Sequence, residues 1–139
     1  MGSNPSADAT TTLDAQSLAA SLTVRDLQTS LAWYRDVVGF TVDREFARDD
    51  RLFAVSLRAG QARVLLTQDD GAKGLDRERG VGFSLQLTTS QSVDAIAARI
   101  TAHGGTLAAG PTDTRWGARM IRLEDPDGFK FVISSGQPS

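Results

Sequence analysis

Few residues in this sequence could carry acid–base or metal chemistry. His103 is the only histidine and cysteine is absent, so one chain cannot build a histidine pair, a thiolate metal site or a cysteine nucleophile. The sequence places His103 in the last turn of a predicted helix, where a histidine interacts favourably with the helix dipole. This pattern favours a structural role for His103 over a catalytic one.

Two pairs of carboxylates are the next candidates. Asp69 and Asp70 are adjacent, and Asp125 and Asp127 flank a proline in the string Asp-Pro-Asp-Gly. Asp, Pro and Gly are the residues that form turns, so both pairs are predicted to shape turns. The alternative is a site for a hard cation with oxygen ligands.

Two tryptophans and two cations could contact a ligand. Trp116 could stack on a flat molecule or lie in the core, and the ligand role is favoured. Trp33 lies off the main stripe of its predicted helix, which favours packing at a seam between modules or subunits. Arg122 and Lys130 could pair with an anionic ligand or extend into solvent.

Composition limits the class of protein. The chain has 139 residues, enough for one ordinary domain, and a net charge of −2 with no basic block. Nucleic-acid binding and membrane-surface binding therefore lack their usual electrostatic signature. Residues 1–17 are rich in Ser, Thr, Ala and Asp without an apolar run, which predicts a flexible tail rather than a secretory signal. A cytoplasmic protein is expected.

A strand, a helix and three strands occur in the same order twice. In the first copy Leu22 and Val24 alternate with polar residues, and Asp26 precedes a helical stripe that ends at Gly39. In both copies three strand-like runs follow the helix, at 40–46, 52–57 and 62–67, and at 106–109, 118–123 and 129–134.

The repeat predicts an α+β fold built from two βαβββ modules. The boundaries are a module at 18–68, a linker at 69–80 that is rich in Gly and charge, and a module at 81–135. Units of about fifty residues usually need their neighbour to complete a core. We therefore expect one domain, 18–135, with an open, cleft-containing mixed sheet.

Two strings carry a family resemblance. The segment from Leu22 to Phe40, and Trp116-Gly117 followed by Asp-Pro-Asp-Gly at 125–128, resemble the first and last elements of the vicinal-oxygen-chelate superfamily, which includes glyoxalase I, bleomycin-resistance proteins and extradiol dioxygenases. The form resembles the bleomycin-resistance-like members. At the positions where the family's metal enzymes carry ligands, this chain has residues without donor atoms: Ala19, Val64, Gly82 and Val132. Because the chain departs from the metal enzymes at all four positions, we expect no metal and no cofactor.

Alternation within strands predicts which side chains face the cleft. Bulky residues should lie under the helices, namely Leu22, Val24, Phe83, Leu85, Leu87, Ile121, Leu123, Phe131 and Ile133. Their neighbours should face the cleft, namely Ala19, Ser21, Thr23, Gly82, Ser84, Gln86, Thr88, Met120, Arg122, Lys130, Val132 and Ser134.

The expected function is metal-independent binding of a small organic, aromatic molecule, as sequestration or sensing. The candidate binding residues mix apolar walls with placed polar groups: Ser21, Thr23, Val64, Ser84, Gln86, Trp116, Met120, Arg122 and Val132. The resemblance also implies a homodimer. The alternative is a lyase, isomerase or dioxygenase-type enzyme that acts without metal or with a metal at a shifted site. A general base would then be needed, and this predicted face offers Lys130 but no histidine or carboxylate.

Overall fold

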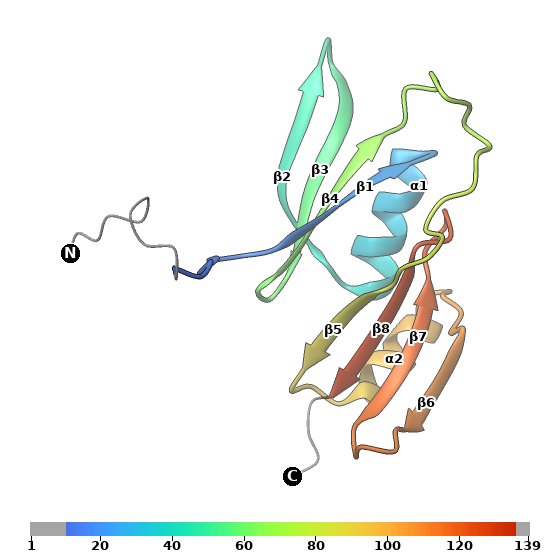
Figure 1. Cartoon of the computed structure of the whole chain (residues 1–139). Coiled ribbons are helices and arrows are strands. Elements are labelled where there is room, and N and C mark those ends of the chain that lie inside the picture. Colours follow the sequence, from blue (N-terminus) through green and yellow to red (C-terminus); the bar gives the residue numbers. More distant parts are fainter. Residues whose placement is uncertain (1–10, 136–139) are drawn as a thin grey trace.

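The computed structural model, described here for residues 11–135, contains two βαβββ modules (Figure 1). The first comprises β1 (Ala19–Val24), α1 (Leu27–Ala32), the π-helix η2 (Trp33–Val38), β2 (Thr41–Arg48), β3 (Arg51–Ala59) and β4 (Ala62–Gln68). The second comprises β5 (Leu85–Thr89), α2 (Val93–Ala102), β6 (Ala109–Asp113), β7 (Arg119–Glu124) and β8 (Lys130–Ser135). The predicted α+β class and the duplicated module are confirmed.

The two modules share one sheet topology. The first sheet, called sheet A, has the strand order β1-β4-β3-β2, and the second, sheet B, has the order β5-β8-β7-β6. In each sheet the first strand of the module pairs in parallel with the last strand, and the other pairs are antiparallel. β1 and β5 are therefore edge strands, each with one edge that no other strand within residues 11–135 pairs with.

Most of the predicted tail, residues 1–17, lies outside the residues that the structure describes. Residues 1–10 lie outside the described residues, and residues 11–17 are exposed. The module and linker boundaries stay predictions. No helix within residues 11–135 is long and apolar enough to span a membrane.

The first helix begins as predicted but changes form after six residues. The Asp26 side chain accepts hydrogen bonds from the amides of Gln28 and Thr29 and so caps α1. From Trp33 onward the helix is π-helical, and it ends at Gly39, whose φ of 108° lies in the left-handed region. The predicted stripe is thus interrupted, and both Trp33 and Tyr34 contact Phe131 of the second module, with ring centroids 6.2 Å and 5.7 Å away.

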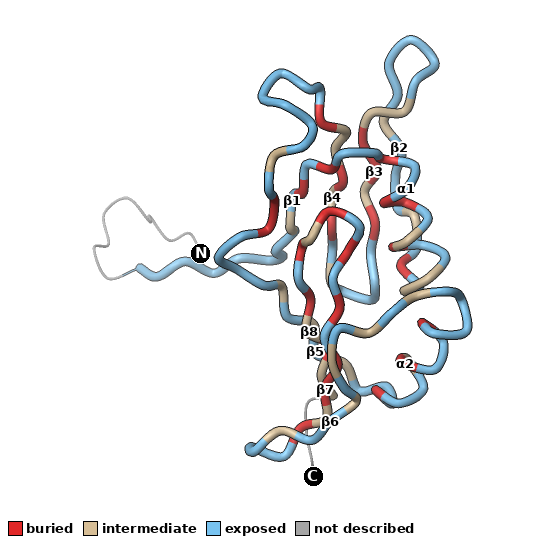
Figure 2. Tube along the Cα trace, turned by 90° about the vertical axis from the view of Figure 1, so that its right-hand side faces the viewer, coloured by how far each residue is buried: buried red, intermediate tan, exposed pale blue. Residues whose placement is uncertain are grey.

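One hydrophobic core joins the two modules. It lies between the helices and the inner faces of both sheets, where buried positions alternate with exposed ones along the strands (Figure 2). The alternation predicted for the closing hairpin is confirmed, because Ile121, Leu123, Phe131 and Ile133 are all buried. The predicted seam position of Trp33 is also confirmed, since it is half-buried against this core.

Phe83 departs from the predicted pattern. It was expected under the second helix, but β5 begins only at Leu85, so alternation does not extend to Phe83. Its side chain is exposed and its ring lies 6.1 Å from that of Phe129.

Candidate ligand-binding faces

The faces of the sheets that are turned away from the helices, called here the open faces, carry most of the predicted site residues. On sheet B the strand register places Gln86, Val132 and Arg122 in one row across β5, β8 and β7. Gln86 and Arg122 are exposed and Val132 is half-buried. This row joins an apolar side chain to an amide and a guanidinium within one surface.

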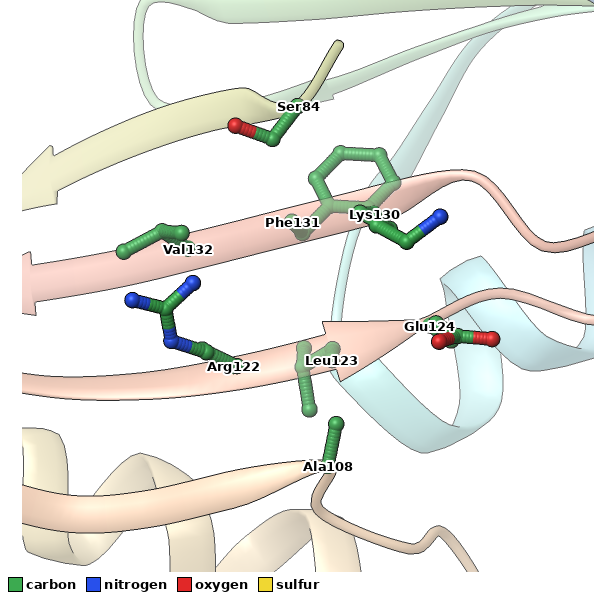
Figure 3. Close-up of a pocket in the computed structure, with 8 residues that line it drawn as sticks. All are labelled: Ser84, Ala108, Arg122, Leu123, Glu124, Lys130, Phe131 and Val132. Atoms are coloured by element: carbon green, nitrogen blue, oxygen red, sulfur yellow. The ribbon is translucent and has the colours of Figure 1, made fainter. Parts of the chain in front are cut away.

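An open pocket of about 230 Å³ includes two members of this row, Val132 and Arg122 (Figure 3). Its lining residues are Ser84, Ala108, Arg122, Leu123, Glu124, Lys130, Phe131 and Val132. Figure 3 shows the guanidinium of Arg122 directed toward Val132 on the neighbouring strand. The volume is below the roughly 300–1,000 Å³ of drug-sized sites, so one chain offers room for part of a ligand.

Glu124 is a feature of this pocket that sequence reasoning missed. The predicted cleft face contained no carboxylate, yet Glu124 follows Arg122 on the same face of β7 and lines the pocket. It pairs in register with Lys130 of β8. Alternation alone would have found it, because Glu124 is two residues beyond Arg122.

Sheet A carries the remaining polar candidates. Ser21 and Thr23 are exposed on the open face of β1, as predicted. Thr23, Thr67 and Gln68 line a second pocket, of about 310 Å³, whose other walls come from the linker and include Lys73 and Arg77. Neither of these two pockets contains residues from both sheets.

The predicted position of Val64 in the cleft is wrong. Val64 pairs with Ala20 of β1 and Leu57 of β3, and it is buried in the core under the helices. Directly opposed residues in a sheet share a face, so the open-face position on β4 is Leu65, which pairs with Ser21.

Trp116 and Met120 lie toward the other end of sheet B. Trp116 is in the turn between β6 and β7 and is 75% exposed, which excludes a core role. It lines neither pocket described above. Met120 pairs with Ser134 and so belongs to the open face, but it is buried.

The Asp-Pro-Asp-Gly turn fastens the two modules together. The Asp125 carboxylate accepts hydrogen bonds from the amides of Asp127 and Phe129, as predicted for a turn, and also from the Tyr34 hydroxyl at 2.6 Å. Asp127 accepts from the Arg25 amide and the Ser30 hydroxyl of the first module. The turn is therefore a buried link between modules as well as a turn.

A buried arginine extends this link to the linker. Arg79 lies 2.8 Å from Asp69 and 4.0 Å from Asp127, and all three side chains are almost fully buried. Arg79 also donates to the carbonyls of Thr23 and Leu75. The Gly71 amide and the Arg79 guanidinium hold the pKa of Asp69 below its usual value.

Replacement of Asp125 with asparagine tests the electrostatics of this link. Burial raises the pKa of Asp125 in spite of the hydrogen bonds from Tyr34 and the two amides. The unfolded chain therefore loses this proton first, near pH 3.9, and the wild type loses stability as pH rises from there to the raised pKa. Asparagine cannot ionise. The free energy of unfolding of Asp125→Asn, relative to wild type, should therefore increase between about pH 4 and neutrality.

Urea denaturation of both proteins from pH 3 to pH 8 measures this difference. Contributions from other groups, including the opposite one from Asp69, are common to both proteins and cancel. A difference that is constant with pH, or that falls as pH rises, would contradict the assignment.

Comparison with known proteins gives the family. The model of the Glyoxalase/Bleomycin resistance protein/Dioxygenase superfamily matches residues 16–133. The chain belongs to this superfamily. The suspected resemblance is thereby confirmed, together with the fold.

Two curated relatives are named as enzymes, and the sequence identity of each to this chain is low. Lactoylglutathione lyase of Salmonella typhimurium is 26% identical over 122 residues, which cover 84% of this chain and 89% of that protein. Catechol-2,3-dioxygenase of Bacillus subtilis is 27% identical over 123 residues, which cover 86% of this chain but 41% of that protein.

A solved structure supports the fold. TnmS3, an antibiotic binding protein from Streptomyces sp. CB03234, superposes with a TM-score of 0.69 at 23% identity, covering 93% of this chain and all of that one. At this identity the likeness concerns the fold.

The side chains of this superfamily member do not fit the metal site that its metal enzymes use. Ala19, Gly82, Val132 and the corrected position Leu65 have no donor atoms, and transition metals in proteins bind imidazole, thiolate or carboxylate. Within residues 11–135 no three His, Cys, Asp or Glu side chains are grouped so as to hold an ion. These positions therefore offer a transition metal no side-chain ligand.

Proposed function

We propose that this superfamily member binds a small organic, aromatic molecule against the open faces of its sheets and sequesters or senses it without metal. The observation that carries the proposal is the row Gln86–Val132–Arg122 beside the pocket at Ser84. An apolar floor with a few fixed polar groups is what small-molecule sites require. The printed description of TnmS3 as antibiotic binding supports the same class of function.

The proposed site is completed by a second copy of the chain. Each of the two pockets described is built on a single sheet, and each is open. A homodimer that sets sheet A of one copy opposite sheet B of the other would enclose a ligand between Thr23 and Arg122, and the free edges of β1 and β5 are available for such contact. In that dimer the exposed Trp116 is assigned to the mouth of the cleft.

Glu124 gives the enzymatic alternative a specific basis. Its carboxylate lines the pocket beside Lys130, so a general base and a cation are both within the candidate site. Two relatives of low sequence identity, named as a lyase and a dioxygenase, also favour this alternative. A reaction that stops in Glu124→Gln while ligand affinity is unchanged would distinguish catalysis from binding alone.

The central experiment is a screen of mono- and bicyclic aromatic compounds by thermal shift. Compounds that bind should raise the melting temperature. Val132→Glu should lower their affinity tenfold or more, because a carboxylate placed on the apolar floor must be desolvated against the ligand. Ala98→Glu, at an exposed position of α2, adds the same charge away from the open faces and should leave affinity unchanged. Absence of hits, or hits that bind Val132→Glu as tightly as wild type, would overturn the proposal.

A further inference from the structure

The open face of sheet A carries an unbalanced set of arginines. Arg58 of β3 and Arg63 of β4 are direct cross-strand partners, one residue pair away from Leu57–Val64 in the core, so both belong to the open face. Arg44 of β2 pairs with Ser56, which in turn pairs with the open-face residue Leu65. Three guanidinium groups from three adjacent strands therefore share one face.

One carboxylate serves two of these arginines. Asp43 lies 3.5 Å from Arg58 and 3.1 Å from Arg63. The register shift between Val42 and Arg44 allows the consecutive residues Asp43 and Arg44 to serve the same face. Like charges directly opposite one another in a sheet are destabilising, and a single shared carboxylate offsets this only in part.

Arg44 has an aromatic partner instead of an acidic one. Its guanidinium carbon lies 5.0 Å from the centroid of the Phe46 ring, and Phe46 pairs with Ala54, which pairs with the open-face residue Thr67. Within residues 11–135 no carboxylate lies within 4.0 Å of Arg44. Glu45, its neighbour, pairs with the core residue Val55 and so is turned to the other face.

We propose that this arginine face receives the acidic group of the ligand, so that the bound molecule is a planar aromatic carboxylate. The inference rests on the proposed function and adds the charge of the ligand to it. Guanidinium groups form paired hydrogen bonds with carboxylates, and Arg44 also offers the plane on which an aromatic ring stacks. The pocket on sheet B, which would face sheet A in the proposed dimer, also carries net positive charge, because its lining includes Arg122 and Lys130 but only one carboxylate, Glu124.

Three related probes test the sign of the charge directly. 2-Naphthoate, 2-naphthamide and 2-naphthylmethylammonium share one ring system and differ in charge. Titrated by calorimetry at low salt, the carboxylate should bind at least tenfold more tightly than the amide, and the ammonium most weakly. Arg44→Gln should weaken binding of the carboxylate about tenfold and binding of the amide much less, because both lose the stacking plane but only the carboxylate loses a charge partner. Arg99→Gln removes a positive charge from α2, away from the open faces, and should leave the affinities for both the carboxylate and the amide unchanged.

The outcomes separate this inference from the proposed function. Equal affinity for all three probes, or an equal loss for carboxylate and amide in Arg44→Gln, would overturn the charge preference and leave aromatic binding in place. Failure of all three probes would also overturn it, whereas the proposed function is decided by the wider aromatic screen and by the effect of Val132→Glu on its hits.

Discussion

Replacement of Arg79 with methionine is expected to lower the free energy of unfolding by about 3–5 kcal/mol. Methionine retains much of the apolar stem but removes the cation that lies 2.8 Å from Asp69 and 4.0 Å from Asp127. Both carboxylates are nearly fully buried, so they would lose a charge partner in a region of low dielectric constant. Two carbonyl acceptors, at Thr23 and Leu75, would also lose a donor. Urea denaturation at pH 7 measures the loss.

Arg77→Met is the matched control. Arg77 also lies 2.8 Å from Asp69, but its side chain is 35% exposed, so water can replace much of what the arginine supplies. The expected loss is about 1 kcal/mol or less. Equal losses in the two variants, or a loss below 1 kcal/mol in Arg79→Met, would show that the buried ion cluster does not stabilise the folded protein.

Replacement of Gly80 with alanine is expected to cost about 2–5 kcal/mol, from backbone strain and overpacking together. Gly80 has a φ of +73°, and an added Cβ would lie 2.7 Å from the Gly128 carbonyl oxygen and 3.0 Å from Phe129 Cα. Both contacts are with backbone, which cannot turn aside as a side chain can. The end of the linker would thus be pushed off the Asp-Pro-Asp-Gly turn.

Gly60→Ala separates the two contributions. Gly60 has a φ of +61°, but nothing lies within 4 Å of its Cβ position. Its cost should be limited to the left-handed backbone, about 1–2 kcal/mol. Thermal or urea unfolding of both variants gives the comparison, and a Gly80→Ala variant no less stable than Gly60→Ala would contradict the close approach.

Fold class could be predicted from the sequence because its signals are local and occur twice. The alternation at Ile121 and Leu123, and the stop at Gly39, depend on near neighbours in the chain. The face of β4 was mispredicted because Val64, Leu65 and Leu66 are consecutive apolar residues, which leave no alternation to read. Only the pairing of β4 with β1 resolves it.

A different reason explains why the buried link between the modules could not be predicted from the sequence. Asp125 and Asp127 fully account for a turn by themselves, so their local sequence gives no sign of partners 91 to 102 residues away. Arg79 lies in a charged, glycine-rich stretch that is typical of solvated loops, yet its side chain is buried. Likewise, the arginine face of sheet A depends on the register of three strands, which composition does not encode.

The most direct test of ligand binding on the open faces is an amide chemical-shift titration of the ¹⁵N-labelled protein with the tightest aromatic hit. The proposal predicts saturable shifts at Gln86, Arg122 and Val132 of sheet B and at Thr23 and Leu65 of sheet A, all with one dissociation constant, because the two faces enclose one ligand. Shifts confined to the helix-covered core, shifts on one sheet only, or shifts that do not saturate would contradict the account.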